Sequence, residues 1–117
     1  MRVLVVDDDS TNIMLLDRIL KRMGIVDIAI AENGKEAVEI CKENDFNTIL
    51  MDIRMPIMDG FEATKIIKEM KEINIVALTT HPIEDIYSQY KEAGFDYYIS
   101  KPIKANILEE YFQLLKN

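Results

Sequence analysis

Acidic, hydroxyl and amino side chains directly follow four of the short apolar runs in this sequence. These side chains belong to Asp7, Asp8, Asp9, Asp52, Thr79 and Lys101. Clustered carboxylates repel one another, and an opposed cation removes that penalty. Carboxylate oxygens are hard ligands suited to Mg²⁺ or Mn²⁺, while an ammonium or hydroxyl group can bind phosphoryl oxygens. The set therefore predicts phosphoryl chemistry at a divalent metal, with one carboxylate as a nucleophile that becomes an aspartyl-phosphate.

No other nucleophile in the sequence competes with these carboxylates. Ser10 has no histidine near it in sequence, and Cys41 falls on an apolar helix face. The single histidine, His81, precedes Pro82 and is typical of a helix start rather than of a catalytic base.

Two hydrophobic patterns alternate along the chain and must position these side chains. Short β-branched runs, apolar on both faces, predict buried strands of a parallel sheet at residues 3–6, 28–31, 48–51, 75–78 and 97–99. The segments between and after them carry apolar residues at spacings of three and four, which predicts helices. Ser10 is the expected N-cap of the first helix, and Gly24 and Gly94 are expected to end the first and fourth.

Five strand–helix units joined by right-handed crossovers predict an α/β protein, a doubly wound parallel sheet with helices on both faces. In such a sheet, ligands bind outside the carboxyl ends of the strands, near the point where strand order reverses. Since the polar residues all follow strands, we expect their side chains to meet at one site.

Composition narrows the classes of partner. The chain has 117 residues, which fits one domain, and its net charge of −7 argues against nucleic acid or an anionic membrane as a direct partner. No apolar run is long enough for membrane insertion. One cysteine excludes an intrachain disulfide framework. These features predict a cytoplasmic, acidic, globular domain.

Four segments together resemble the receiver domain of two-component response regulators, including the chemotaxis regulators. They are Val6-Asp7-Asp8, residues 51–60, Ala77-Leu78-Thr79 and Ser100-Lys101-Pro102. The resemblance implies a flavodoxin-like (βα)5 sandwich whose five parallel strands lie in the order 2-1-3-4-5. It also implies one receiver domain over residues 1–117, with no output domain.

The resemblance assigns a role to each residue of the set. Asp52 is the implied phosphoacceptor, Thr79 and Lys101 are implied to contact the phosphoryl group, and Tyr98 is the implied switch aromatic residue. The implied ligands of Mg²⁺ or Mn²⁺ are Asp7, Asp8, Asp52 and the backbone carbonyl of Arg54. The Lys101–Pro102 bond is expected to be cis. Thr80, where the family often has alanine, departs from the usual pattern and bears on reaction rate.

The implied function is that of a switch that receives its phosphoryl group from a histidine kinase or a histidine phosphotransfer protein. It would catalyse only its own phosphorylation and dephosphorylation. We expect a downstream protein target, or a homodimer, to bind the face made by the fourth helix, fifth strand and fifth helix. Tyr87, Tyr90 and Tyr111 are expected to offer contact area on that face.

Two other functions share parts of this pattern. A small Mg²⁺-dependent phosphatase or phosphotransferase with an aspartyl-phosphate intermediate would need a cap that holds its substrate, for which 117 residues leave no room. A flavin carrier would need a loop rich in serine, threonine and glycine after the first strand, where three aspartates instead repel phosphate.

Overall fold

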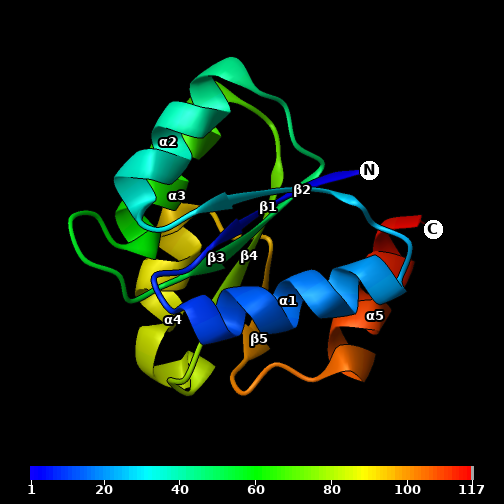
Figure 1. Cartoon of the computed structure of the whole chain (residues 1–117). Coiled ribbons are helices and arrows are strands. Elements are labelled where there is room, and N and C mark those ends of the chain that lie inside the picture. The colour runs from blue at the N-terminus through cyan, green and yellow to red at the C-terminus, as the bar shows by residue number, and fades with distance from the viewer. Residues whose placement is uncertain (117) are drawn as a thin grey trace.

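The computed structural model describes residues 1–116, in which five β-strands alternate with five α-helices (Figure 1). The strands are β1 (Arg2–Val6), β2 (Asp27–Ala31), β3 (Thr48–Asp52), β4 (Asn74–Thr79) and β5 (Tyr97–Ser100). The helices are α1 (Ser10–Arg22), α2 (Gly34–Glu43), α3 (Gly60–Met70), α4 (Ile83–Ala93) and α5 (Ala105–Lys116). Every strand and helix that the hydrophobic pattern predicts is present.

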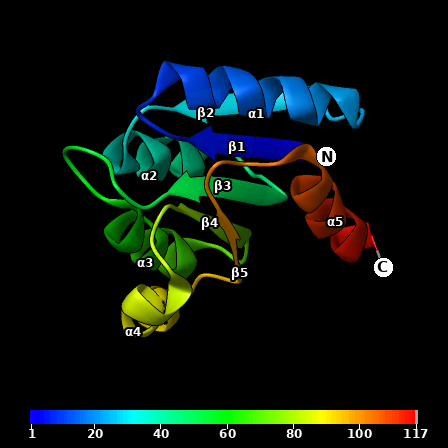
Figure 2. The same ribbon diagram turned by 90° about the horizontal axis from the view of Figure 1, so that it is seen from below.

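The strands form one parallel sheet in the order β2-β1-β3-β4-β5, which confirms the flavodoxin-like topology. Successive side chains of a strand point to opposite faces, and both faces of this sheet are covered. Leu4 and Val6 of β1 pack in the cluster beneath α2, α3 and α4, while Val3 and Val5 pack against α1 and α5. Figure 2 shows the sheet between these two helical layers.

The direction of the connections changes beside β1, and this positions the site. After β1 the chain enters α1 on one face of the sheet, whereas after β3 it enters α3 on the opposite face (Figure 2). The loops that follow these neighbouring strands therefore separate and leave a crevice at the carboxyl edge of the sheet. Asp7 and Asp52 stand at this edge.

Side-chain caps fix the start of three helices. The carboxylates of Asp9 and Asp59 and the amide oxygen of Asn33 accept backbone N–H bonds from the first turns of α1, α3 and α2. The expectation that Ser10 caps α1 is wrong by one residue, because Asp9 has the extended backbone of a cap and Ser10 is already helical. Gly94 ends α4 with a positive φ, as expected. None of the helices within residues 1–116 is long and apolar enough to cross a membrane.

The tyrosines of α4 and α5 differ in exposure from what the sequence suggests. Tyr90 and Tyr111 are buried, so the expectation that they offer contact area is wrong. Tyr90 packs between the rings of Phe95 and Tyr98, and helical periodicity alone does not show that its ring turns inward. Tyr87 is 53% exposed, so it remains available on the surface.

One close backbone approach connects α3 to the end of β3. The N–H of Gly60 donates to the carbonyl oxygen of Ile53 at 2.9 Å, and a Cβ atom on Gly60 would overlap the carbonyl oxygen of Asp52. Only glycine lets the first turn of α3 lie this close to β3.

We therefore expect Gly60→Ala to lower the free energy of unfolding by about 1–3 kcal/mol, a typical cost of overpacking. It should also shift the NMR resonances of Asp52 and Ile53, because the added methyl group pushes directly on their backbone. Gly24→Ala is the matched control. Its φ is +87°, and a Cβ atom there would meet no heavy atom within 4 Å apart from its chain neighbours, so its cost is local to the end of α1. Unchanged resonances of Asp52 in folded Gly60→Ala would contradict this account.

Candidate phosphoryl and metal site

Four neighbouring strands bring the polar residues to one edge of the sheet. Asp7 follows β1, Asp52 ends β3, Thr79 ends β4 and Lys101 follows β5. The register aligns these ends, since Val6 pairs with Met51, Asp52 with Leu78 and Thr79 with Ser100. Residues far apart in sequence therefore share one site, as the sequence predicts.

Two buried carboxylates share one ammonium group at the centre of this site. The Nζ atom of Lys101 lies 3.0 Å from Oδ1 of Asp52 and 3.4 Å from Oδ2 of Asp7. The side chains of Asp7 and Asp52 are 1% and 8% exposed, and that of Lys101 is 15% exposed. Water screens these charges poorly, so the attraction within each ion pair is much stronger than in an ion pair on the surface. The free-energy cost of removing the charges from water is also larger.

Asp8 adds a third carboxylate on the solvent side. One oxygen from each of Asp7, Asp8 and Asp52 lies within 4.8 Å of the others, and Asp8 itself is exposed. Asp9 is separate from this group, because it caps α1 while its own N–H donates to Oδ1 of Asp7 at 2.9 Å. Three carboxylates against one ammonium leave an excess of negative charge, which suits a divalent cation with hard oxygen ligands.

The hydroxyl of Thr79 is held in a defined orientation. Its oxygen accepts the backbone N–H of His81 at 2.9 Å, and the residue is buried. A hydroxyl that accepts one hydrogen bond still has its own hydrogen to donate. Thr79 can therefore donate to an oxygen atom bound in the pocket.

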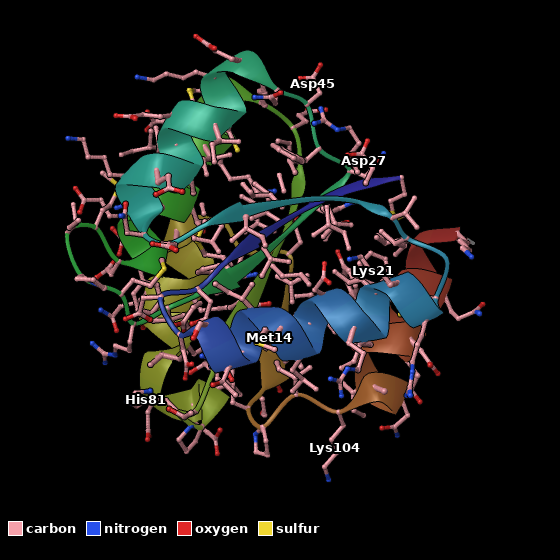
Figure 3. The ribbon with its side chains drawn as sticks, in the orientation of Figure 1. Met14, Lys21, Asp27, Asp45, His81 and Lys104 are labelled. Carbon is pink, nitrogen blue, oxygen red and sulfur yellow. The ribbon has the colours of Figure 1, made fainter. Side chains whose placement is uncertain are left out.

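A pocket of about 210 Å³ opens above these groups. Its lining combines the expected residues with others, namely Asp7, Asp8, Asp9, Asn12, Asp52, Ile53, Arg54, Leu78, Thr79, Thr80, His81 and Lys101. Sequence reasoning missed Asn12. The available signal was its place in the first turn of α1, where a helical side chain points back toward the start of the helix. Figure 3 shows His81 at the end of the molecule where α4 begins.

Two of the expected residues lie differently from the rest. Arg54 lines the pocket with an exposed side chain, and the role expected of its carbonyl stays a prediction. Tyr98 does not line this pocket: it is 41% exposed, and its ring meets that of Tyr90 edge-on at a centroid distance of 5.9 Å. The Lys101–Pro102 bond is cis, as expected.

Burial perturbs the titration of the two charged partners in opposite ways. Burial raises the pKa of Asp52 and Asp7 raises it further, while bonds from Lys101 and from the backbone of Arg54 oppose the rise without cancelling it. Burial works to lower the pKa of Lys101, but the hydrogen bond and the charge of Asp52, aided by Asp7, outweigh it, so this pKa is raised. Lys101 is therefore protonated at neutral pH, and the ionised form of Asp52 is less favourable in the folded protein than in water.

Comparison with known proteins gives the site a context. The model of the response regulator receiver domain family matches residues 3–113 of this chain. The chain is 39% identical to the Two-component response regulator 24 of Arabidopsis thaliana, over 90% of this chain and 76% of that protein. It is 37% identical to Hybrid signal transduction histidine kinase I of Dictyostelium discoideum, over 93% of this chain. The chain spans only 7% of that kinase.

Three solved structures are similar over 97% of this chain. The chemotaxis protein CheY4 of Vibrio cholerae has a TM-score of 0.89, 28% identity and 96% coverage. The receiver domain of the sensor histidine kinase PA1611 of Pseudomonas aeruginosa, with a magnesium ion coordinated in its active site cleft, has a TM-score of 0.86, 27% identity and 94% coverage. The receiver domain of Saccharomyces cerevisiae Ssk1, crystallised with the histidine phosphotransfer protein Ypd1, has a TM-score of 0.87, 29% identity and 85% coverage.

Because the pKa of Asp52 is raised, we expect the free energy of unfolding of the metal-free protein to depend on pH. A carboxyl group whose pKa is higher in the folded than in the unfolded state stabilises the fold at low pH and loses that contribution as pH rises through the folded pKa. In the presence of a chelator, Asp52→Asn should therefore be more stable than the wild type at neutral pH. Urea denaturation should show this gap narrowing as the pH falls toward about 4.

Lys101 loses the hydrogen bond and the charge of Asp52 in this variant but keeps Asp7 as a partner. Added Mg²⁺ should stabilise the wild type more than the variant, because a ligand stabilises the state that binds it. A variant that is less stable than the wild type at every pH would show that Asp52 is not strained.

Proposed function

We propose that this chain, which belongs to the response regulator receiver domain family of two-component systems, accepts a phosphoryl group on Asp52. The observation that carries the proposal is the buried carboxylate of Asp52, which faces Asp7 and Lys101 in a pocket open to solvent. The donor would be a phosphohistidine of a histidine kinase or of a histidine phosphotransfer protein. The kinase relative and the similar structure crystallised with Ypd1 support this class of donor.

The residues of the pocket divide the work of the transfer. A carboxylate oxygen of Asp52 attacks phosphorus, the P–N bond of the phosphohistidine breaks, and its electron pair leaves with the imidazole, which takes up a proton. Lys101 orients the carboxylate through Oδ1 before attack and donates to the phosphoryl group afterwards. The hydroxyl of Thr79 donates to another phosphoryl oxygen. The reaction depends on position and charge balance, with no general base on Asp52.

The acidic cluster fits Mg²⁺, or Mn²⁺ in its place. Asp7, Asp8 and Asp52 would hold it, with the backbone carbonyl of Arg54. When bound, the ion neutralises the carboxylates and the phosphoryl oxygens, which otherwise repel each other. Magnesium in the cleft of the similar PA1611 structure supports this choice of ion.

In this proposal the chain catalyses only its own phosphorylation and dephosphorylation. The five strand–helix units take up residues 2–116, and no insertion among them forms a cap over the pocket. A small phosphatase or phosphotransferase would need such a cap to hold its substrate, so nothing in this structure favours that alternative. The assignment of residues 1–117 to one receiver domain stays a prediction, as does a cytoplasmic location.

Acetyl phosphate, a small donor, tests the phosphoacceptor directly. Intact-mass spectrometry should show one added phosphoryl group on the wild type with Mg²⁺ and none with a chelator, because the carboxylates repel the donor without the ion. Asp52→Asn should take up none. Asp17→Asn, which changes an aspartate on α1 away from the pocket, is the matched control and should react normally.

Lys101→Ala should still bind Mg²⁺ but react about 100-fold more slowly, since it loses a donor that stabilises the transferred charge. Equal labelling of the wild type and Asp52→Asn would overturn the assignment of Asp52. Normal labelling of Lys101→Ala would remove Lys101 from the mechanism.

The output of the proposed switch is the α4–β5–α5 face, through which a downstream target or a second copy would bind. A phosphoryl oxygen would draw the hydroxyl of Thr79 away from its bond with His81. That movement would vacate space next to Tyr98, whose ring is now exposed and rests on Tyr90. Rotation of Tyr98 inward would then reshape the face, with a coupling free energy of about 1–3 kcal/mol.

Beryllofluoride, a phosphoryl mimic, tests this coupling without a partner. Added with Mg²⁺, it should shift the NMR resonances of the pocket and also those of residues 83–112. In Thr79→Ala, the shifts near Asp52 should persist and those of residues 83–112 should shrink. Thr64→Ala, which also removes a buried threonine hydroxyl but lies on α3, is the control and should respond like the wild type. Shifts confined to the pocket in the wild type would refute the proposed output face.

A further inference from the structure

A groove of about 580 Å³ follows the outer edge of β5. β5 is the last strand of the sheet, so within residues 1–116 no strand covers this edge. The groove is lined by the consecutive residues Tyr97, Tyr98, Ile99, Ser100, Lys101 and Pro102, together with Lys104 and Ile107. It is distinct from the phosphoryl pocket, with which it shares only Lys101.

The backbone of β5 has hydrogen-bonding capacity on this side. The N–H of Lys101 points to β4, where it donates to the carbonyl oxygen of Thr79 at 2.8 Å. Backbone groups of successive residues in a strand point alternately to the two sides. Tyr98 and Ser100 therefore turn their N–H and C=O groups away from β4 and into the groove. Such an edge is a template for an added strand.

The side chains around the groove select for charge. Its charged residues are both lysines, although the chain carries 21 acidic residues and a net charge of −7. The ammonium of Lys101 is bonded to Asp52 and Asp7 in the phosphoryl pocket, so Lys104 is the cation that an occupant of the groove would meet. Lys104 extends away from the body of the molecule into solvent (Figure 3). Tyr98 and the half-buried Ile107 supply apolar surface. An occupant with carboxylates and apolar side chains complements this lining.

We infer that the outer edge of β5 binds an extended, acidic segment of a partner protein as an added strand. Its backbone would pair with Tyr98 and Ser100, alternate apolar side chains would lie against Tyr98 and Ile107, and a carboxylate would meet Lys104. A second copy of this chain is a poorer occupant, because residues 97–102 of its own β5 edge carry no carboxylate that could meet Lys104. The inference rests on the proposed function, because it specifies the partner chemistry of the proposed output face.

A library of short random peptides displayed on phage tests the inference. Peptides would be selected on the full chain, both free and with Mg²⁺ and beryllofluoride. We expect the selected peptides to be rich in Asp and Glu and to carry apolar residues at every second position. Selected peptides with apolar residues at spacings of three and four would indicate a helical ligand and overturn the inference. So would the absence of any enriched peptide.

Amide hydrogen exchange identifies the binding mode for one selected peptide. The amides of Tyr98 and Ser100 should exchange more slowly in the complex, since an added strand protects them. Unchanged exchange of both amides in a saturated complex would overturn strand addition. A dimer of the free chain in sedimentation experiments, lost in Ser100→Pro, would likewise overturn it in favour of a second copy.

Charge reversal tests the chemistry of the occupant. Lys104→Glu should weaken binding of the selected peptide about tenfold. Lys91→Glu, an exposed lysine of α4 outside the groove, is the matched control and should change it little. Equal effects of the two variants would overturn the role of Lys104.

Labelling of Asp52 by acetyl phosphate, measured on the same samples, separates the two proposals. Labelling without peptide binding overturns the groove inference alone. Peptide binding without labelling overturns the proposed function and leaves strand addition at β5 supported.

Discussion

One shared cation holds the site together. Asp7 and Asp52 are buried beside each other, and the ammonium of Lys101 is the positive charge that both contact. Two carboxylates without it would repel each other where water cannot screen them. The parallel topology satisfies this requirement, because it brings the ends of β1, β3 and β5 to one edge of the sheet.

The arrangement leaves the site only partly compensated. Burial raises the pKa of Asp52 even with Lys101 in contact, so its ionised form is held at a free-energy cost. Burial of an apolar cluster on each face of the sheet stabilises the fold and offsets the free-energy cost of ionised Asp52. Binding of a cation, or transfer of a phosphoryl group, would change the charge of this one spot. Such a change of charge would alter the electrostatic interactions of the loops that line the pocket, which follow β1, β3, β4 and β5.

Much of the fold and of the site could be predicted because each depends on a local pattern. A buried parallel strand is apolar on both faces, so the short β-branched run from Val3 to Val6 predicts such a strand, and the aspartates that follow it mark its end. Side-chain direction at partly buried positions is not local. The sequence cannot tell whether Tyr90 or Tyr87 turns inward, because that depends on Phe95 and Tyr98 from the next strand–helix unit. The predicted N-cap of α1 is one residue too late, because aspartate and serine are equally good N-cap residues and the sequence pattern does not choose between Asp9 and Ser10.

The sequence distance between the charged partners has a consequence for the chain as it is made. Lys101 lies 49 residues after Asp52 and 94 after Asp7. A ribosome releases the N-terminal strands first, so β1 and β3 are available to pair long before their cation emerges. A nascent chain that ends short of Lys101 would hold two adjacent carboxylates without the ammonium group that both contact in the complete sheet. The last third of the chain thus completes the sheet and also removes the electrostatic penalty against closing it, which makes folding of the whole depend on its final segment.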